Sequence, residues 1–335
     1  MQFGAHYQKN PKVSNNMMER DLDFYGCSGD DDSQNNTAAL QAALNDNIGA
    51  LGIPSKKYRI TSQVTQTKPI RIFGNGKNSH IWLDTPTPPS GVINVSFDTA
   101  AEKFSPIYRD LAITGPCPAL FLNLSASYQF CAKLLVEHMF LTNNIGGYSF
   151  TLNNPTNIDG LFCSRFHDNQ CYGGFNLQRA GDSLTFDNNT ITGPGHAFNL
   201  TAVNGASHVI MCENNITVQG MALLAGDFMY SLKFENNQVE HGGSTAIDYM
   251  ILIGGTQQPF NPTIRGNNIN GHNLINAALI AMYSMNHGLV DENILAGCPN
   301  AVYLTSNTSG VRVGKRNINS CPTFLVNQST SNIVE

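Results

Sequence analysis

Charged residues are scarce in this sequence of 335 residues, and their scarcity excludes some classes of protein. They make up 13% of the chain and leave a formal net charge of −5. Proteins that bind nucleic acid usually carry a basic stripe, because clustered lysine and arginine neutralise the phosphates. The sequence has no such stripe, and it lacks the apolar run of about 18 residues that predicts a transmembrane helix. We therefore expect no nucleic-acid partner and no membrane partner.

A secretion signal and a metal-binding motif are missing as well. The first ten residues do not have a basic segment followed by an apolar run, so we expect synthesis without a signal peptide if Met1 is the natural start. The eight cysteines show no CxxC pair and no Cys/His spacing typical of zinc. In a chain of this size without a secretion signal, we expect reduced thiols, several of them inside the fold. The sequence predicts no metal and no cofactor.

What the sequence does contain is a short phrase that recurs between Leu184 and Asn327. Each copy has an apolar-x-apolar strand, a polar turn that usually carries Asn, and a second apolar position seven residues after the first. The six copies start at positions 184, 209, 232, 262, 288 and 311, so the intervals are 25, 23, 30, 26 and 23 residues. Such self-similarity indicates a repeat architecture. We therefore expect one elongated domain, although the length alone would allow two or three globular ones.

The repeat favours a parallel β-helix. Strands this short are unstable alone, but coils stacked about 4.8 Å apart let each strand bond to the strands above and below it. Inward positions such as Leu184, Phe186 and Ile191 would then form a continuous core. A β-sandwich also has strands every 8 to 12 residues or so, but it does not predict the return of the same phrase. The repeated asparagines are interpreted as turn residues that bond between coils.

The beginning of the chain predicts a helical cap. Residues 1–20 have no periodic apolar pattern and are interpreted as a leader or attachment segment. The segment 36–44 places apolar residues, including Leu40 and Leu44, at helical spacing after two asparagines that are possible N-caps. A solenoid needs such a helix at its first coil, because its open end would otherwise face water. We therefore expect a short capping α-helix within one parallel β-helix domain over residues 21–335.

Several motifs in this opening resemble those of a known family. In order they read Asp21-Leu-Asp-Phe-Tyr-Gly26, Gly29-Asp-Asp-Asp32, Thr37-Ala-Ala-Leu-Gln-Ala-Ala-Leu44, Ile53-Pro-x-x-x-Tyr-x-Ile-Thr61 and Ile70-x-Ile-x-Gly-x-Gly76. This order resembles the opening of the pectate-lyase-like right-handed parallel β-helix proteins. Within them it is most similar to bacteriophage tailspike and capsule-depolymerase domains. The resemblance covers residues 21–82 by motif and the remainder by strand pattern.

The resemblance implies a fold, an activity and a set of partners. The fold would be all-β, a single-stranded right-handed parallel β-helix with a short N-terminal capping helix. The protein would be a homotrimeric tailspike-type depolymerase that binds and cleaves a bacterial capsular or O-antigen polysaccharide. It would be located in the virion, on the phage tail beside other tail proteins, and would act at the bacterial cell surface. In this family an extended substrate lies along the sheet that follows the turn, here residues 197–200, 221–224, 246–250, 276–280 and 301–304.

Glycoside hydrolysis needs a carboxylic acid and a carboxylate, about 5–5.5 Å apart for retention and about 6.5–9.5 Å apart for inversion. Two Gly-Asp pairs, ending at Asp182 and Asp227, recur after the predicted substrate-binding strands. If they are equivalent and two coils apart, their spacing is roughly 9.6 Å, near the upper end of the inverting range. Asp182 and Asp227 are therefore predicted to be catalytic. Glu240 is the third predicted catalytic residue, because it stands beside His241 before two glycines.

Further polar and aromatic residues near the same strands are predicted to bind substrate. They are Asp168, Tyr172, Arg179, His196, Tyr230, His241 and Asp248. A lyase would need a base and a cation beside a uronate carboxylate, for which Arg165, His167 and Arg179 are candidates. No clustered acidic Ca²⁺ site is evident, and hydrolysis is predicted over elimination. The alternatives are a lyase, a non-catalytic receptor-binding shaft, and a secreted pectinase glycosylated at the eight Asn-x-Ser/Thr sequons.

Overall fold

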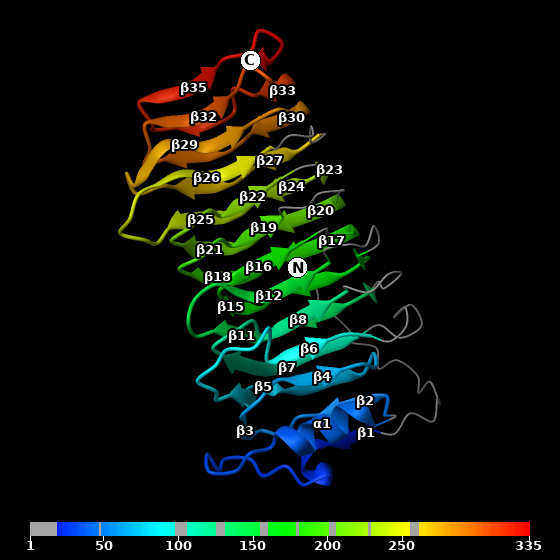
Figure 1. The fold of residues 1–335 in the computed structure, drawn as a ribbon. Coiled ribbons are helices and arrows are strands. Elements are labelled where there is room, and N and C mark those ends of the chain that lie inside the picture. Colours follow the sequence, from blue (N-terminus) through cyan, green and yellow to red (C-terminus); the bar gives the residue numbers. More distant parts are fainter. Residues whose placement is uncertain are drawn as a thin grey trace, which may run out of the picture.

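The computed structural model shows the protein as a right-handed parallel β-helix (Figure 1). It describes residues 19–46, 48–97, 106–124, 131–154, 160–178, 181–200, 206–226, 229–254 and 261–335. The chain climbs coil by coil from a helix at one end to the C-terminal strands at the other. The predicted fold class is confirmed, including the capping helix.

Each coil crosses two sheets, which we call sheet A and sheet B. Sheet A has 25 strands and sheet B has 11. Sheet B receives one strand from each coil. Its strands are β4 (Val64–Gln66), β6 (Ile93–Val95), β8 (Leu120–Asn123), β12 (Tyr148–Asn153), β16 (Gly174–Leu177), β19 (Phe198–Leu200), β22 (Leu223–Ala225), β26 (Ile247–Ile253), β29 (Ile275–Met282), β32 (Asn300–Leu304) and β35 (Thr323–Asn327).

Sheet A has two arms that meet at a corner. The first arm holds β1 (Glu19–Asp21), β2 (Ala50–Gly52), β10 (Leu135–Glu137), β14 (Arg165–His167), β17 (Asp182–Asp187), β20 (Ala206–Cys212), β24 (Lys233–Glu235), β27 (Thr263–Arg265), β30 (Asn286–Asp291), β33 (Ser309–Val313) and β36 (Ile333–Val334). The second arm holds β3 (Lys57–Ile60), β11 (Phe140–Asn143), β15 (Gln170–Tyr172), β18 (Thr190–Gly193), β21 (Asn215–Val218), β25 (Gln238–His241), β28 (Asn268–Asn270), β31 (Ile294–Ala296) and β34 (Ile318–Asn319). The long strands β5 (Arg71–Leu83) and β7 (Ile107–Gly115) run through both arms, and β9 (Cys131–Ala132), β13 (Leu161–Phe162) and β23 (Met229–Tyr230) lead into the first arm.

The corner between the two arms is built from the repeated asparagines, as the interpretation of the sequence required. In the coil of β17, Asn188 takes a left-handed backbone with φ of 57°, and the next residue, Asn189, is 1% exposed. The Nδ2 atom of Asn189 donates to the Phe166 carbonyl and to Oδ1 of Asn214 in the next coil, both at 3.0 Å. The same bonds recur at every coil from Asn169 to Asn317. We call this row the Asn ladder, and the turn that carries it the Asn corner.

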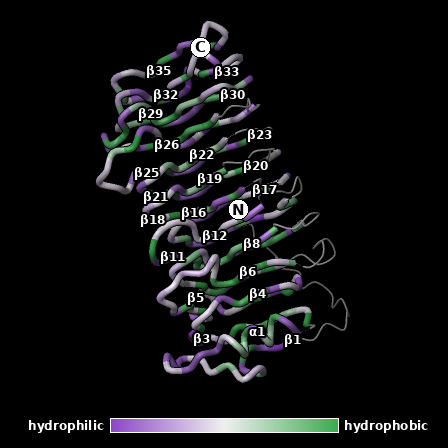
Figure 2. The backbone as a smooth tube through the Cα atoms, viewed as in Figure 1, coloured by the Kyte–Doolittle hydropathy of each residue, from purple (hydrophilic) through white to green (hydrophobic). Residues whose placement is uncertain are grey.

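Apolar side chains fill the interior along the whole axis, and hydrophobic segments recur at the strands of successive coils (Figure 2). The widest side chains are stacked in the middle. Phe166 lies parallel to Phe186 with ring centroids 4.6 Å apart, and Phe175 lies parallel to Phe198 at 5.5 Å. Because equivalent residues superpose from coil to coil, a flat ring in one coil packs on the ring of the next. We call these four rings, together with Phe150, the Phe stack.

Helix α1 (Thr37–Asn45) covers the first coil, at the blue end of Figure 1. Its apolar face buries Leu40, Ala43 and Leu44 against the solenoid. Asn35 accepts the hydrogen bond from the Thr37 amide, whereas Asn36 is buried and donates to the Arg59 carbonyl. β1 starts at Glu19, two residues before the boundary predicted for the β-helix. Residues 1–18 of the predicted leader lie outside the described residues.

Candidate functional site

The outer face of sheet B carries one column of side chains, one per coil, aligned by strand register. The column is Thr65, Asn94, Phe121, Thr151, Asn176, Asn199, Leu224, Leu252, Ala281, Tyr303 and Val326. From Thr65 to Tyr303, the residues on either side of each of these face the core and are buried, whereas those beside Val326 are not. Up to Asn199 the column is mostly amide and hydroxyl, and from Leu224 onward it is aliphatic and aromatic. The face therefore has a polar half and an apolar half.

Hydrogen bonds across coils order the polar half. Asn199 donates from Nδ2 to the Tyr148 hydroxyl at 2.9 Å, and Asn153 donates to Oδ1 of Asn123 at 3.0 Å. Tyr148 reaches across the coil of Gly174, where a Cβ would collide with the His196 and Ala197 carbonyls. The Oδ1 atoms of Asn94 and Asn199 have no hydrogen-bond partner among the described residues. Both oxygens are buried, so they are unpaired inside the fold and are not presented to a ligand at the surface.

Three tyrosines from consecutive coils line the apolar half. The hydroxyls of Tyr249 and Tyr283 are 2.5 Å apart, and their rings meet edge to face with centroids at 6.0 Å. The Tyr283 and Tyr303 ring centroids lie 6.1 Å apart. Burial, followed by the hydrogen bond to Tyr249, raises the pKa of the Tyr283 hydroxyl, so it stays protonated at neutral pH. Beside them, Asn276 donates to the predicted binding residue Asp248 at 3.3 Å. We call Tyr249, Tyr283 and Tyr303 the tyrosine row.

Asp182 lies where the chain leaves sheet B and enters the first arm. Its carboxylate is 2.9 Å from Nδ1 of His208. Burial acts to raise the pKa of Asp182, but hydrogen bonds from His208 and Ser207 outweigh it and bring the pKa below its usual value. A carboxylate held ionised in this way suits a base or a nucleophile, whereas a general acid needs a raised pKa. The ionised form of Asp182 is therefore favoured in the folded protein.

The register corrects the supposed equivalence of the two Gly-Asp pairs. Asp182 is aligned with Ser207, and Ser207 is aligned with Tyr230. The residue equivalent to Asp182 two coils later is therefore Tyr230, a predicted binding residue that is 42% exposed. Asp227 precedes it by three positions and lies outside the described residues, as does Arg179. The spacing of two coils cannot be applied to Asp182 and Asp227, because the intervening loops differ in length.

Glu240 and His241 lie on the opposite side of sheet B, where the chain approaches it from the second arm. Both belong to strand β25 and not to a loop, so they face opposite ways. The Glu240 side chain is 41% exposed, with its carboxylate 4.0 Å from Nε2 of His272. His241 is only 3% exposed, and its Nε2 is 2.9 Å from the Thr245 carbonyl. This burial is at odds with the prediction that His241 binds substrate and gives it a structural role at the turn.

His196 also holds the turn before sheet B. Its Nδ1 accepts the Met221 amide of the next coil at 2.9 Å. Burial lowers the pKa of His196, so the neutral imidazole is favoured. Because Nδ1 is already an acceptor, the proton of the neutral ring lies on Nε2. One nitrogen therefore stays free to donate a hydrogen bond.

The structure does not bring the described catalytic candidates into one pair. Glu240 is aligned with Thr217 and Thr192 in the second arm, beyond the Asn corner. Asp182 is the first residue of β17 in the first arm, before the left-handed turn at Ser183. The rest of the first arm therefore separates the register position of Asp182 from that of Glu240. Asp182 lies beside the imidazole of His208, and Glu240 lies beside that of His272. The two carboxylates are not close to each other.

A grouping of charges on the outer face of the first arm includes Arg165 and His167, which the sequence analysis named as candidates for a lyase. Asp187 accepts from both Nε and Nη2 of Arg165, at 2.9 and 2.5 Å, and lies 2.8 Å from Nδ1 of His167. Burial acts to raise the pKa of Asp187, but the bonds from Arg165 and His167 outweigh it and lower the pKa. The sequence analysis did not single out Asp187 as a site residue. The strand register could have revealed this contact, because His167 and Asp187 are aligned in neighbouring strands although they are 20 residues apart in the sequence.

The predicted binding residue Asp168 belongs to the next column of the same grouping. His138 lies between two carboxylates, with Nδ1 3.1 Å from Asp110 and Nε2 3.5 Å from Asp168. All three residues take left-handed corner conformations in successive coils. Tyr172, also predicted to bind substrate, is 44% exposed on the second arm of the coil that contains Asp168. The structure therefore places Asp168 and Tyr172 on sheet A and not beside sheet B.

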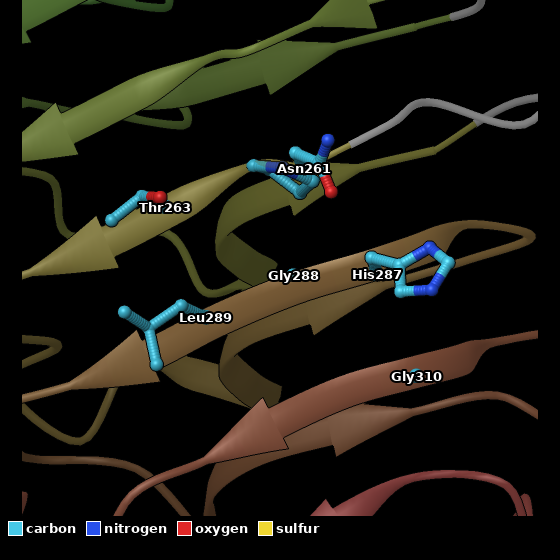
Figure 3. Close-up of a pocket in the computed structure, with 7 residues that line it drawn as sticks. Asn261, Thr263, His287, Gly288, Leu289 and Gly310 are labelled. Carbon is cyan, nitrogen blue, oxygen red and sulfur yellow. The ribbon is translucent and has the colours of Figure 1, made fainter.

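Among the described ranges, no group of three or more His, Cys, Asp or Glu side chains is arranged to hold a metal ion. Within the same ranges, no helix is long and apolar enough to cross a membrane. A small hollow of about 230 Å³ lies at the turn before the first arm, between β27, β30 and β33 (Figure 3). Asn261, Thr263 and His287 line it. It is smaller than usual ligand pockets of about 300–1,000 Å³ and includes none of the predicted site residues.

Comparisons with known proteins agree with this architecture. No family model matches the chain, and no curated protein matches it in sequence. Among solved structures, tailspike protein 3 of bacteriophage CBA120 aligns with a TM-score of 0.56 and 14% identity over 94% of this chain. The chain spans 61% of that tailspike.

Two further structures match over nearly their whole lengths. The A-module of the Azotobacter vinelandii mannuronan C-5 epimerase AlgE6 has a TM-score of 0.64 and 14% identity, covering 94% of this chain and 97% of that one. PfbA, a surface adhesin of Streptococcus pneumoniae, has a TM-score of 0.56 and 10% identity, covering 90% and 86%. The predicted resemblance to parallel β-helix proteins is thereby confirmed at the level of the fold.

Proposed function

We propose that this protein is a polysaccharide depolymerase that binds a bacterial capsular or O-antigen polysaccharide along sheet B and hydrolyses it. The observation that carries the proposal is the two-part outer face of sheet B. Its amides offer hydrogen bonds to sugar hydroxyls, and its tyrosine row offers flat apolar surfaces to sugar rings. Because every coil repeats the face about 4.8 Å further on, it suits a polymer better than a small metabolite.

Asp182 is proposed as the ionised carboxylate of the catalytic pair, because its pKa is lowered beside His208 at the edge of sheet B. Asp227 and Glu240 are retained as the proposed partners. Asp227 follows β22 and Gly226 directly in the sequence. The substrate contacts proposed with them are His196, Asp248 and Tyr230, all near an edge of sheet B, together with Arg179. Asp168 and Tyr172 are retained as contacts for a polysaccharide that extends from sheet B onto sheet A.

Hydrolysis is proposed over β-elimination. Elimination needs a cation to stabilise charge on a uronate and a base to take the proton beside it. The described candidates for those roles, Arg165 and His167, are both bound to Asp187. An ion pair of this kind already neutralises the cation, so it has less charge to offer a substrate. The second function we retain is polysaccharide binding without cleavage, which the fold likeness to the adhesin PfbA supports.

The fold likeness to a phage tailspike supports a finer form of the proposal. In this form the protein is a homotrimer carried on a phage tail, beside other tail proteins, and it meets its substrate at the bacterial cell surface. Size-exclusion chromatography with light scattering tests the assembly. A monomer at micromolar concentration would contradict the trimer without bearing on the activity.

The activity is tested by incubating the protein with capsular and O-antigen polysaccharides from a panel of bacteria. Shorter chains with new reducing ends are expected. Products that absorb in the ultraviolet would reveal unsaturated ends and replace hydrolysis with elimination. Tight binding of a polysaccharide without any shortening of it would support the non-catalytic function instead.

The site is tested with three variants and a matched control. Asp182→Asn, Asp227→Asn and Glu240→Gln are each expected to lower turnover by about 100-fold or more if they remove acid–base catalysis. Binding should be retained in each. Glu213→Gln alters a carboxylate at the Asn corner, away from sheet B, and should leave turnover unchanged. Full activity in all three site variants would remove this assignment of the catalytic residues.

A further inference from the structure

Two cysteines at the C-terminal end of the solenoid lie in direct contact. The Sγ atoms of Cys298 and Cys321 are 2.9 Å apart. Cys298 precedes Asn300 by two residues, and Cys321 precedes Thr323 by two, while Asn300 and Thr323 are register partners in β32 and β35. The two cysteines therefore occupy equivalent places in adjacent coils. Both are buried, at 5% and 7% exposure, and both are thiols in the structure.

The coil geometry suits a covalent bond between them. A disulfide requires Cα atoms about 4.4–6.8 Å apart, and equivalent positions in adjacent coils are roughly 4.8 Å apart. The Cys298 thiol donates to the Asn300 carbonyl in its own coil, so a bond to Cys321 would replace that weak hydrogen bond. The two residues are 23 positions apart, which is one full coil. A disulfide there would close the last coil upon itself.

The position matters because the two ends of the solenoid differ. At the N-terminal end, α1 covers the first coil. At the other end, no helix covers the last coil within residues 261–335. β35 pairs only with β32, and β36 only with β33. Apolar side chains are exposed there, with Ile318 at 65% and Ile333 at 55%. Within residues 261–335 the last coil pairs with a neighbour on one side only, so a covalent link to the coil beneath it would have its largest effect here.

We propose that Cys298 and Cys321 form a redox-controlled staple, a disulfide that locks the last coil onto the one before it. The oxidant is a low-molecular-weight disulfide, written RSSR. The thiolate of one cysteine attacks RSSR, forms a mixed disulfide and releases one RS⁻, which takes up a proton as RSH. The thiolate of the other cysteine then attacks the protein sulfur of the mixed disulfide and releases a second RSH. Both cysteines are oxidised and RSSR is reduced, with two protons transferred to the two RSH molecules.

Access to the thiols sets the rate of this exchange. Burial, followed by the contact with Cys321, raises the pKa of the Cys298 thiol well above its usual value. Little thiolate is then present while the last coil is closed, so oxidation proceeds when that coil opens. The staple is independent of the proposed activity on polysaccharide. It follows that the C-terminal coil is locked in an oxidising environment and released again when thiols reduce the disulfide.

The staple is tested on the full chain, reduced or treated with oxidised glutathione. After oxidation, a titration of thiols in denaturant should find two fewer thiols per chain, and peptide mapping should find residues 298 and 321 joined. Hydrogen exchange of the β35 amides should slow by roughly tenfold or more relative to the reduced protein. A full complement of thiols after oxidation, or a link that joins other cysteines, would overturn the proposal.

Variants separate the staple from other effects of oxidation. Cys298→Ser and Cys321→Ser should each abolish the difference in β35 exchange between oxidised and reduced protein. Cys163→Ser is the control, because Cys163 is exposed and lies far along the axis, and it should keep the difference in full. If the serine variants fail to fold, the thiol titration and peptide map of the wild-type protein still decide the question.

Discussion

At the scale of the residue, two neighbouring residues have different roles in the Asn corner. In the coils from Asn169 to Asn293, the first residue of the pair takes the left-handed backbone, and the second is buried and bonds to the coils on both sides. The sequence predicted that the asparagines are structural. It did not predict which of the two forms the ladder, because both positions accept Asn. At Glu213 and Gly266 the first residue is not Asn at all, which is consistent with a backbone role for that position.

The burial of the ladder asparagines predicts that Asn214 and its exposed neighbour Asn215 differ sharply in their effect on stability. Asn214 donates to the Phe186 carbonyl and to Asn237, and its Oδ1 accepts two bonds from Asn189. Asn214→Ala removes buried bonds on both sides and should lower the free energy of unfolding by about 2–4 kcal/mol. Asn215→Ala alters the exposed neighbour and should cost less than about 1 kcal/mol. Urea denaturation measures both, and equal losses would contradict the ladder.

A second residue-scale prediction concerns Asp187 and acid. Its pKa is lowered in the folded protein, so its ionised form stabilises the fold above the pKa of the unfolded chain, about 3.9. That stability is lost as the pH falls from about 5 toward the folded pKa. Asp187→Asn should lower stability at pH 7 by about 1–3 kcal/mol, since it weakens charged hydrogen bonds to Arg165 and His167.

The same variant should flatten the acid dependence. Between about pH 5 and pH 3, its unfolding free energy should fall less steeply than that of the wild type. Asp84→Asn is a matched control, because Asp84 forms an ion pair with Arg59 at a more exposed position. An acid profile for Asp187→Asn that runs parallel to the wild-type profile would contradict the role assigned to this carboxylate. Unfolding in urea at a series of pH values provides the measurement.

At the scale of the element, the apolar spacing predicted α1 because a helix of this kind has its own short period. The strands of the first coils were harder to predict. The motif Ile70-x-Ile-x-Gly-x-Gly76 ends at a glycine, whereas β5 continues past it to Leu83 and runs through both arms. Gly76 has a φ of 75° and turns the strand without an Asn corner. A pattern search built on the Asn phrase cannot find such a coil, because the corner there is made by another residue.

The capping helix yields a prediction of its own. Leu40 is 1% exposed under α1, so Leu40→Ala should cost about 2–4 kcal/mol through lost burial and a cavity. A loosened cap also exposes the first coil's core, so the variant should bind more of a hydrophobic dye and aggregate sooner on heating. Ala38→Ser, on the exposed side of the same helix, should cost about 0.5 kcal/mol. Equal behaviour of the two variants would mean that α1 does not cap the solenoid.

At the scale of the whole molecule, the repeat predicted the fold but not the site. Predicting the fold requires only a recurring sequence pattern, and six copies of it were enough. A site needs the register of each coil, and the register depends on loops of unequal length. Asp182 is aligned with Tyr230 and not with Asp227, because more residues separate β16 from Asp182 than separate β22 from Asp227. Likewise Arg165, His167 and Asp187 meet across a short coil that the average period of the repeat does not predict.

A solenoid in which coils touch only their neighbours should open from its weaker end. The Phe stack fixes the middle coils, α1 covers one end, and the last coil is paired on one side only. Native-state hydrogen exchange under reducing conditions should therefore show the greatest protection in β17 and β19. Amides of β35 should open with a free energy lower by about 2 kcal/mol or more. Uniform protection along the axis would mean that the coils unfold as one cooperative unit, and that the uncovered end is no weaker than the capped one.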